Sequence, residues 1–541
     1  MTSLLVAFAF AQIHPARFPN GTVVSDSSIA SEVGASILRK GGNAVDAAVA
    51  TGFALAVTFP AAGNLGGGGF MLVRMANGQT VAIDYREVAP RRATKDMYKN
   101  PADSLSGYLA SGVPGTPMGM WEAHRKFGKL PWKDLVEPSV RLARDGFVVS
   151  HGLAGELKAF KPRNPDKGYS ELFALKDFQA GEILRQPDLA KTLERIKTLG
   201  AKGFYEGETA KLIDQAMRAN GGLIDTLDLK NYKLVVRTPL QGEYRGYQVL
   251  TMPPPSSGGI ALLQMLTMLK DDDLTKTGFQ SSATLHLAAE AMKRAFADRS
   301  MHLGDPDFVS VPTGQLLNPD YLKTRRASIT DRATPSSEIK GMNPDSGGMH
   351  TTHYSVVDRE GNAVANTYTL NTGYGSKVII PGTGVLMNNE MDDFTTQPGK
   401  PNVFGLIQSE KNIVEPGKRP LSSMTPTILV RDGKVAFVIG SPGGPTIINT
   451  VFQTILNVVD FRMNIQLAVA APRFHHQWMP DEIKWEPYGL STDVRLALEA
   501  RGHELSAGSR MGSCHCIQVD ASGVKLAGVD PRVSSSGAAG W

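Results

Sequence analysis

A change of pattern at residue 351 constrains this chain more than any other feature. The segment 326–350 is rich in Ser, Gly, Pro and Asp and shows no periodicity. A β-branched run begins at Thr351 and ends at Asp358. Residues 359–362 then predict a turn, and a second strand is expected from Ala363 to about Leu370. The sequence therefore predicts a β-hairpin that starts directly after an irregular loop.

The threonine at this junction has a possible chemical use. A threonine hydroxyl is a poor nucleophile, but at a chain terminus the α-amino group of the same residue can accept the hydroxyl proton. A loose loop before the first residue of a central strand suits self-cleavage of the His350–Thr351 bond. From these residues alone the alternative is an ordinary linker into a hairpin, since Ser- and Thr-rich junctions of this kind are common.

Composition excludes some classes of partner. The 541 residues are 42% hydrophobic and 20% charged, which are ordinary globular values, and they suffice for several domains or one large layered domain. The net charge is +5 with no run of five like charges, so we expect no nucleic-acid partner.

The two cysteines, Cys514 and Cys516, are expected to share one face of a strand, where they are poorly placed for a disulfide. One Cys-x-Cys also lacks the second ligand pair of a zinc site. So few cysteines suit either the cytosol or a bacterial periplasm.

The first residues resemble an export signal. Residues 4–11 are apolar, and Ala9-Phe10-Ala11 has the small-x-small form of a cleavage site, although the positively charged lead-in is missing. We expect residues 1–11 to be the remnant of a signal peptide and the protein to be periplasmic or secreted; the alternative is a disordered N-terminus. No stretch reaches the roughly 20 apolar residues that span a bilayer.

Helices are expected at 28–39 and 44–57, and the second is apolar all round, which indicates burial on every side. Gly66–Gly69 precede a predicted hairpin at 70–87, whereas a phosphate loop follows a strand and opens a helix, so we expect close approach of backbone or of a substrate there. Residues 121–300 are expected to be mainly helical, with a rigid turn at Pro253–Gly259.

A second junction lies near residue 441. An apolar strand is expected at 434–440, followed by Ser441-Pro442-Gly443-Gly444 and a helix at 445–461. Two glycines at a helix N-terminus can direct backbone N–H groups at one point, which suits a developing oxyanion. The alternative is a simple tight turn.

Six short motifs occur in order along the chain. They are Asp84-Tyr85-Arg86-Glu87, Thr351-Thr352-His353-Tyr354, Thr369-Leu370-Asn371, Asn388–Phe394, Arg419–Pro426 and Gly440–Gly444. Together they resemble the γ-glutamyltransferases (γ-glutamyl transpeptidases) of the N-terminal nucleophile hydrolase superfamily, and the resemblance extends from about Gly21 to Arg532. It implies an α+β fold, a four-layer αββα sandwich. It also implies a precursor that cleaves itself into a large subunit, 12–350, and a small subunit, 351–541, which pair around one shared core.

The resemblance also implies a role for each motif residue. Thr351 would be the nucleophile both in self-cleavage at His350–Thr351 and in attack on γ-glutamyl amides such as glutathione, with its own amine as base. Thr369 would orient it, and Gly443 and Gly444 would form the oxyanion hole. The substrate's α-carboxylate would be bound by Arg86, Ser422 and Ser423, and its ammonium by Asn371, Glu390 and Asp393. No cofactor or metal is expected.

The expected activity is transfer of the γ-glutamyl group to water or to an amino acid or peptide. A lid at 398–417 carries Phe404 where relatives often have tyrosine. One alternative is a glutaryl (cephalosporin) acylase of the same superfamily, although its substrate lacks the ammonium that Glu390 and Asp393 would bind. Another is a binding protein for γ-glutamyl compounds without turnover. The adjacent His475 and His476 are expected to point to opposite faces and to be structural.

Overall fold

The computed structural model describes residues 13–159, 176–339, 351–395 and 409–541. The predicted signal remnant, His350, Phe404 and most of the predicted lid lie outside these ranges. Within them, no helix combines the length and apolar character needed to cross a membrane.

Two seven-stranded sheets form the centre of the molecule. The first, which contains the predicted hairpin, has the order β21 (Gly537–Gly540), β2 (Thr22–Ser25), β10 (Thr352–Val357), β11 (Ala363–Thr369), β3 (Gly68–Arg74), β4 (Thr80–Asp84) and β7 (Val235–Arg237). The second has the order β1 (Ala16–Phe18), β20 (Lys525–Gly528), β19 (Cys516–Val519), β15 (Lys434–Ile439), β14 (Thr427–Arg431), β9 (Tyr247–Thr251) and β8 (Leu240–Tyr244). Shorter sheets pair β5 (Phe147–Val148) with β6 (Ile183–Leu184), β12 (Ile379–Ile380) with β13 (Val385–Leu386), and β16 (Phe474–His475), β17 (Ile483–Trp485) and β18 (Leu505–Ala507).

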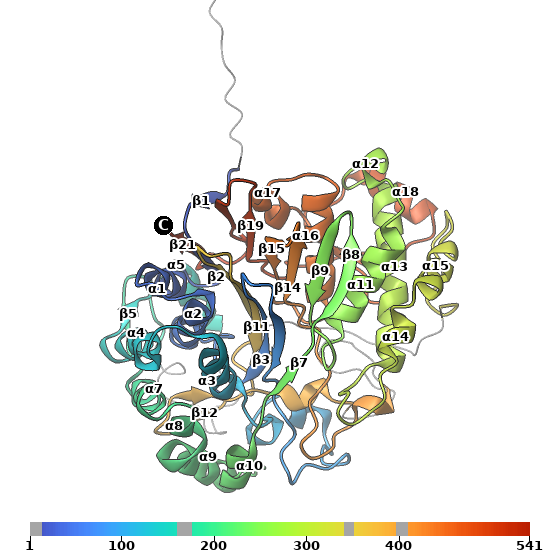
Figure 1. The fold of residues 1–541 in the computed structure, drawn as a ribbon. Coiled ribbons are helices and arrows are strands. Elements are labelled where there is room, and N and C mark those ends of the chain that lie inside the picture. The colour runs from blue at the N-terminus through green and yellow to red at the C-terminus, as the bar shows by residue number, and fades with distance from the viewer. Residues whose placement is uncertain (1–12, 160–175, 340–350, 396–408) are drawn as a thin grey trace, which may run out of the picture.

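Helices cover the outer face of each sheet, which gives the four layers that the family resemblance implied (Figure 1). On the side of the first sheet lie α1 (Ser28–Arg39), α2 (Ala44–Thr58), α3 (Thr116–Phe127), α4 (Trp132–Asp145), α5 (His151–Ala159), α7 (Pro187–Leu199), α8 (Lys202–Tyr205), α9 (Gly207–Ala219) and α10 (Thr226–Asn231). On the other side lie α11 (Gly258–Leu269), α12 (Leu274–Thr277), α13 (Ser282–His302), α14 (Thr313–Leu316), α15 (Pro319–Ala327), α16 (Thr446–Val459), α17 (Ile465–Ala470) and α18 (Thr492–Ala500).

Strand β3 shows how one sequence contributes to two layers of core. Met71 and Val73 pack with the helices around α2, whereas Phe70 and Leu72 pack in the core that includes the second sheet. Successive side chains of a strand point to opposite faces, so a strand buried on both sides is continuously apolar. Every residue of β3 is accordingly buried.

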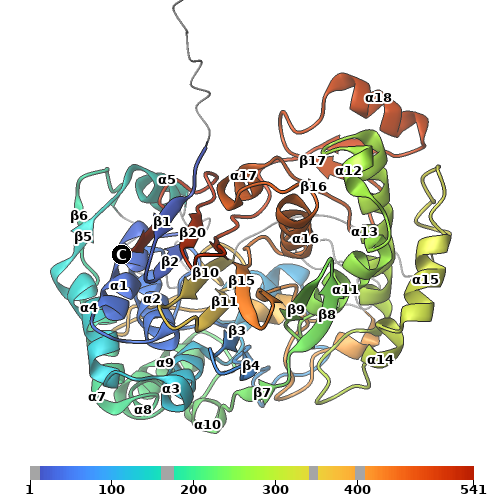
Figure 2. The ribbon, with the colours of Figure 1, turned by 45° about the horizontal axis from the view of Figure 1, so that its top comes forward.

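The segments before and after residue 351 share both sheets. In the first sheet, β10 lies between β2, from the N-terminal part, and its hairpin partner β11. In the second, β14 pairs with β9 on one side and with β15 on the other. Figure 2 shows the hairpin β10–β11 at the centre of the molecule, between elements from both ends of the chain. Neither segment could complete a sheet of this kind alone.

The predicted N-terminal helices agree with the structure. Helix α1 spans Ser28–Arg39, and the Ser27 side chain accepts a hydrogen bond from the N–H of Ala30. Helix α2 begins with a capping box in which Asn43 and Asp46 each accept from the backbone of the other. All 15 residues of α2 are buried, as its uniformly apolar sequence predicts.

The region 121–300 is mainly helical, as predicted, but it also contains strands that were not predicted, among them β8 and β9, an antiparallel pair at the edge of the second sheet. Their turn is Arg245-Gly246, and both residues have positive φ, +51° and +80°. Two-residue hairpin turns need this geometry, and Asn-Gly or Asp-Gly is its usual signature. Arg-Gly gave no such signal.

The glycine run before β3 serves close backbone packing. A Cβ on Gly67 would lie 2.0 Å from the carbonyl oxygen of Thr369, and one on Gly69 would lie 2.5 Å from that of Thr367. Only glycine fits such contacts. The run therefore places β3 directly against the strand that ends at Thr369.

Candidate active site

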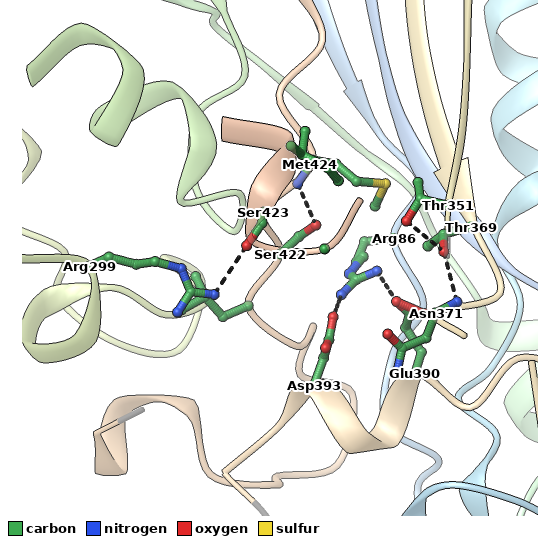
Figure 3. Close-up of a pocket in the computed structure, with 13 residues that line it drawn as sticks. Arg86, Arg299, Thr351, Thr369, Asn371, Glu390, Asp393, Ser422, Ser423 and Met424 are labelled. Carbon is green, nitrogen blue, oxygen red and sulfur yellow. Dashed lines mark hydrogen bonds and ion pairs between the residues drawn. The ribbon is translucent and has the colours of Figure 1, made fainter. Parts of the chain in front are cut away.

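The register of the β10–β11 hairpin places two threonine hydroxyls together. Thr352 pairs with Tyr368, so the next position sets Thr351 opposite Thr369. Directly opposed residues of an antiparallel pair project on the same face. The Oγ1 atoms of Thr351 and Thr369 lie 3.3 Å apart, within hydrogen-bond range (Figure 3).

The chain directly after β11 fixes the second of these hydroxyls. The N–H of Asn371 donates to Thr369 Oγ1 at 2.7 Å, and the Asn371 side chain donates to the carbonyl of Asn389 at 3.0 Å. Asn371 has φ +77°, in the left-handed region that asparagine tolerates better than most residues. Asn371, held by these two bonds, lines the same pocket as Thr351.

The glycine turn before α16 lies at the same pocket. Gly443 and Gly444 have φ +137° and +53°, so both adopt conformations that favour glycine. Gly444 lines the pocket, and the carbonyl of Gly443 accepts from the Thr446 hydroxyl at 2.7 Å. Helix α16 starts at Thr446, and the positive end of its dipole therefore lies beside Thr351.

The opposite wall of the pocket is a buried ion-pair cluster. Arg86 donates from Nη1 to Glu390 and from Nη2 to Asp393, and its Nε donates to the carbonyl of Pro420 at 3.3 Å. Glu390 and Asp393 lie in one turn of 3₁₀ helix, Glu390–Asp393. The guanidinium fork thus holds two carboxylates from a segment about 300 positions further along the chain.

Burial shifts the titration of these groups. It raises the pKa of Glu390 well above its usual range and also raises that of Asp393, although Arg86 opposes both shifts. Burial lowers the pKa of Arg86, but Glu390 and Asp393 raise it by more, so the guanidinium stays charged. The neighbouring Glu87 lies 3.7 Å from Arg86 Nη1 with neither carboxylate oxygen hydrogen-bonded, and burial raises its pKa to about 7.

Two serines complete this wall. Ser422 Oγ accepts from the N–H of Met424 at 3.1 Å, and Ser423 Oγ accepts from Arg299 Nη2 at 3.4 Å. Because each oxygen accepts a hydrogen bond from the protein, each hydroxyl proton remains for donation elsewhere. Both serines line the pocket.

The residues predicted from sequence therefore converge on one small pocket (Figure 3). Its lining includes Arg86, Thr351, Thr369, Asn371, Glu390, Asp393, Ser422, Ser423 and Gly444. Gly443 is adjacent to this lining through Gly444, whereas the predicted residues His350 and Phe404 lie outside the described part of the chain.

Sequence reasoning missed two groups near this site. One is Arg299, which also lines the pocket. The other is a buried network around Asp26, which accepts from Thr352 Oγ1 at 2.6 Å and bonds His515 Nε2 at 2.7 Å. This network supports the residue after Thr351, but its members are 489 positions apart, so no local motif connects them.

One group of potential metal ligands in the described ranges lies elsewhere, and its members are already hydrogen-bonded. Ligand atoms of His286, Glu290 and His503 all lie within 4.8 Å of one another. However, His286 Nδ1 bonds His503 Nε2 at 2.8 Å, and Glu290 pairs with Arg294 at 2.6 Å. The lone pairs a metal would need are thus engaged, and these residues do not line the pocket.

The two cysteines and the adjacent histidines lie as expected. Cys514 and Cys516 are buried free thiols with sulfur atoms 3.2 Å apart, which confirms that they share one face. His475 bonds Asn449 and Gln477, whereas His476 bonds Asp481, so the two rings face different partners.

Comparisons with known proteins agree with this geometry. The sequence model of the family described as Gamma-glutamyltranspeptidase matches residues 30–540. The chain belongs to this family. It is 49% identical over 540 residues to the "Glutathione hydrolase proenzyme" of Escherichia coli (strain K12), covering 98% of this chain and 93% of that protein.

Two solved structures extend the comparison. The crystal structure of a cephalosporin acylase from Bacillus halodurans superposes with a TM-score of 0.87 at 28% identity, over 100% of this chain and 99% of that one. The Helicobacter pylori gamma-glutamyltranspeptidase matches with a TM-score of 0.56 at 47% identity, over 58% of this chain and 93% of that chain. The gamma-glutamyltranspeptidase family fold is thus shared by proteins named for two activities.

Proposed function

We propose that this gamma-glutamyltranspeptidase family member is a self-cleaving γ-glutamyl transpeptidase and hydrolase that acts on glutathione and related γ-glutamyl amides. One observation carries the proposal. A nucleophile candidate, Thr351, lies in the same pocket as a carboxylate-binding fork and two buried carboxylates. A ligand with an α-carboxylate, an α-ammonium and a side-chain amide fits this combination of groups.

The first reaction is maturation. Thr351 Oγ1 attacks the carbonyl carbon of His350, the peptide nitrogen leaves, and the acyl group moves from nitrogen to oxygen as an ester. Water then hydrolyses the ester, which gives His350 a terminal carboxylate and Thr351 a free amine. This produces a large subunit, 12–350, and a small subunit, 351–541. Because both segments contribute strands to both sheets, the products stay paired as a heterodimer.

The second reaction is γ-glutamyl transfer. The freed amine accepts the hydroxyl proton of Thr351; an ordinary α-amine has a pKa near ~7.7–8.0, so a useful fraction is neutral at physiological pH. The hydroxyl oxygen attacks the γ-carbonyl, and the backbone N–H groups of Gly443 and Gly444 stabilise the oxyanion. The leaving amine takes the proton, and water or an acceptor amine then cleaves the γ-glutamyl ester.

Thr369 has a positioning role in both reactions. Its hydroxyl lies beside that of Thr351 and is itself bonded by the N–H of Asn371. A fixed neighbour of this kind limits the rotamers of the nucleophile and keeps it oriented toward the carbonyl carbon.

Recognition uses exchange of ion pairs. Arg86 is paired with Glu390 and Asp393. A zwitterionic substrate can enter this cluster because its α-carboxylate takes donors from Arg86, Ser422 and Ser423. Its ammonium then donates hydrogen bonds to Glu390, Asp393 and Asn371, so the two carboxylates keep a positively charged partner. Every buried charge keeps an opposite charge, which avoids the large penalty for an unpaired buried ion.

The same reasoning extends to location and access. The apolar residues 4–11 support export to the periplasm or secretion, followed by removal of residues 1–11. The segment 398–417, with Phe404, would act as a lid that limits water and favours an incoming amine.

Two substrates test the proposal. We expect purified protein to release p-nitroaniline from L-γ-glutamyl-p-nitroanilide and to leave a glutaryl cephalosporin uncleaved. Turnover of the cephalosporin alone would identify a glutaryl acylase instead. A denaturing gel of the same sample distinguishes either enzyme from a non-catalytic binding protein. The binding protein would run as one uncut chain and would cleave neither substrate.

A further inference from the structure

Arg299 is a buried cation in the wall of the pocket that the assigned roles leave unused. It lies near the end of α13, is 2% exposed, and lines the pocket on the side of Ser422 and Ser423 (Figure 3). Its Nε donates to Ser257 Oγ at 2.9 Å and its Nη2 to Ser423 Oγ at 3.4 Å. Its Nη1 is buried without a hydrogen-bond partner.

Two other buried cations of α13 are bonded directly to carboxylates. Arg294, on the same helix, pairs with Glu290 at 2.6 Å, and Lys293 pairs with Asp481 at 2.8 Å. Arg299 instead has two serine hydroxyls. Asp393, which Arg86 holds, acts on Arg299 through its charge but is not bonded to it. A buried cation without a directly bonded carboxylate is expensive, so such an arrangement needs a reason. Burial lowers the pKa of Arg299 to about 10, which still leaves it protonated at neutral pH.

The two hydrogen bonds of Arg299 connect it to Ser422 and Ser423, the serines that line the pocket. Ser257 belongs to the turn 253–259, and its N–H and hydroxyl both donate to the carbonyl of Ser422, at 2.8 Å and 2.7 Å. Ser422 in turn donates its N–H to the carbonyl of Pro255 at 2.9 Å. Arg299 therefore supports Ser422 through Ser257 and contacts Ser423 directly.

The contact with Ser423 also fixes a direction. The guanidinium can only donate, so Ser423 Oγ accepts from it and the serine proton must point elsewhere. Ser423 lines the pocket, so this proton is available to a ligand there. A carboxylate is the ligand group that accepts such donors and also places a negative charge close to Arg299, which has no bonded carboxylate of its own.

We propose that Arg299 is a positioning residue for the substrate's α-carboxylate. It orients the Ser423 hydroxyl, holds Ser422 in place through Ser257, and adds a second positive charge behind the carboxylate that Arg86 binds. This role rests on the proposed γ-glutamyl activity. It explains why the large subunit's turn 253–259 is joined by hydrogen bonds to the small subunit's segment 421–424.

Ligands that differ only at the α-carbon test the role. L-Glutamine carries the amide, the carboxylate and the ammonium; glutaramate lacks the ammonium; 4-aminobutyramide lacks the carboxylate. Each is used as a competitive inhibitor of L-γ-glutamyl-p-nitroanilide hydrolysis. For Arg299→Met we expect the KM of the p-nitroanilide and the inhibition constants of L-glutamine and glutaramate to rise about 10-fold or more, from the loss of charge-assisted hydrogen bonding. The inhibition constant of 4-aminobutyramide and kcat should change less than about threefold, because neither depends on the carboxylate.

Three variants control for a merely structural effect. Arg299→Lys keeps the charge and should recover most of the affinity for glutaramate. Arg294→Lys changes a buried arginine of the same helix that does not line the pocket, and it should lower the thermal midpoint without changing the KM. The double variant Ser423→Ala with Arg299→Met should raise the inhibition constant of glutaramate by less than the product of the two single-variant factors. The reason is that Arg299 acts partly through Ser423.

Some results would contradict the role of Arg299, and others would contradict the proposed function. An unchanged KM in self-cleaved Arg299→Met, or equal weakening of 4-aminobutyramide and glutaramate, would overturn the role of Arg299. If Arg299→Met gives no soluble protein, Ser257→Ala removes the Nε partner instead, and selective weakening of glutaramate is again the required result. Wild-type protein without γ-glutamyl turnover would refute the proposed function itself, a failure that is visible before any variant is made.

Discussion

The two walls of the pocket are built in different ways. Thr351 and Thr369 come from one hairpin, are 18 positions apart, and are placed by the register of strands that are buried on both faces. Arg86, Glu390 and Asp393 come from the chain after β4 and from a single 3₁₀ turn, and they are held to one another by charge. The nucleophile wall therefore depends on backbone pairing, and the recognition wall depends on ion pairs that a ligand can exchange.

This difference predicts which changes affect chemistry and which affect binding. Substitutions in the hairpin should lower kcat or block maturation with little effect on KM. Substitutions in the ion-pair cluster should raise KM and leave maturation intact. The predictions that follow are ordered by the size of the expected effect.

Thr351→Ala should abolish both reactions. Without the hydroxyl no ester can form, so the chain should remain a single full-length band and kcat should fall by about 10³-fold or more, as when other enzymes lose their nucleophile. A denaturing gel and the p-nitroanilide assay measure the two effects. Thr351→Ser, which keeps a hydroxyl, is the matched control and should still cleave itself. Two subunits in the alanine variant would mean that the scissile bond is elsewhere.

Arg86→Lys should separate recognition from maturation. Lysine keeps the charge but cannot hold Glu390 and Asp393, or a ligand carboxylate, through a planar fork. We expect the KM of L-γ-glutamyl-p-nitroanilide to rise by about 10- to 100-fold, with subunits of normal size. If the variant stays uncut, Arg86 is needed for the fold of the nucleophile wall as well, and the two walls are not independent.

Thr369→Val should slow both self-cleavage and γ-glutamyl transfer without weakening substrate binding. Valine fills the same space but cannot bond Thr351 Oγ1 or accept from Asn371. Loss of one orienting hydrogen bond predicts a decrease in kcat of about 10-fold with KM changed by less than about twofold. A rise in KM of the same size as the fall in kcat would place Thr369 in ground-state binding of the substrate instead.

Glu87→Gln should produce the smallest change, visible only as a pH dependence. Burial raises the pKa of Glu87 to about 7, so its carboxylate gains charge as the pH rises through neutrality and then competes with a ligand carboxylate for Arg86. The wild-type inhibition constant of glutaramate should therefore weaken by about threefold between about pH 6 and pH 8. Glutamine does not titrate, so the variant should show a flat profile. If the inhibition constant of glutaramate changes with pH equally in the wild type and in Glu87→Gln, the titrating group is not Glu87.

The hairpin was predictable because its information is local. The β-branched run, the turn at 359–362 and the second strand are adjacent in sequence, and the observed strands, Thr352–Val357 and Ala363–Thr369, agree with the expected ones within a residue. Helix α1 was equally clear, since its apolar face and the Gly41-Gly42 that follows are local in the sequence. The β8–β9 pair was not, because Arg245-Gly246 lacks the usual turn chemistry.

The candidate site was predictable only as far as the family resemblance extends. Its motifs identified the charged residues, but not that Arg86 would be paired with Glu390 and Asp393. Arg299 and the Asp26–His515 pair gave no signal, because their partners are far away in sequence and their residue types are common. Long-range packing alone brings Arg299 to the pocket and Asp26 to Thr352.

The state of one peptide bond tests the account most directly. Intact-mass measurement and N-terminal sequencing of purified protein with γ-glutamyl activity should find a small subunit that begins with Thr351, in proportion to activity. Active protein in which His350 and Thr351 are still joined would contradict the account, because the proposed base would then be an amide nitrogen.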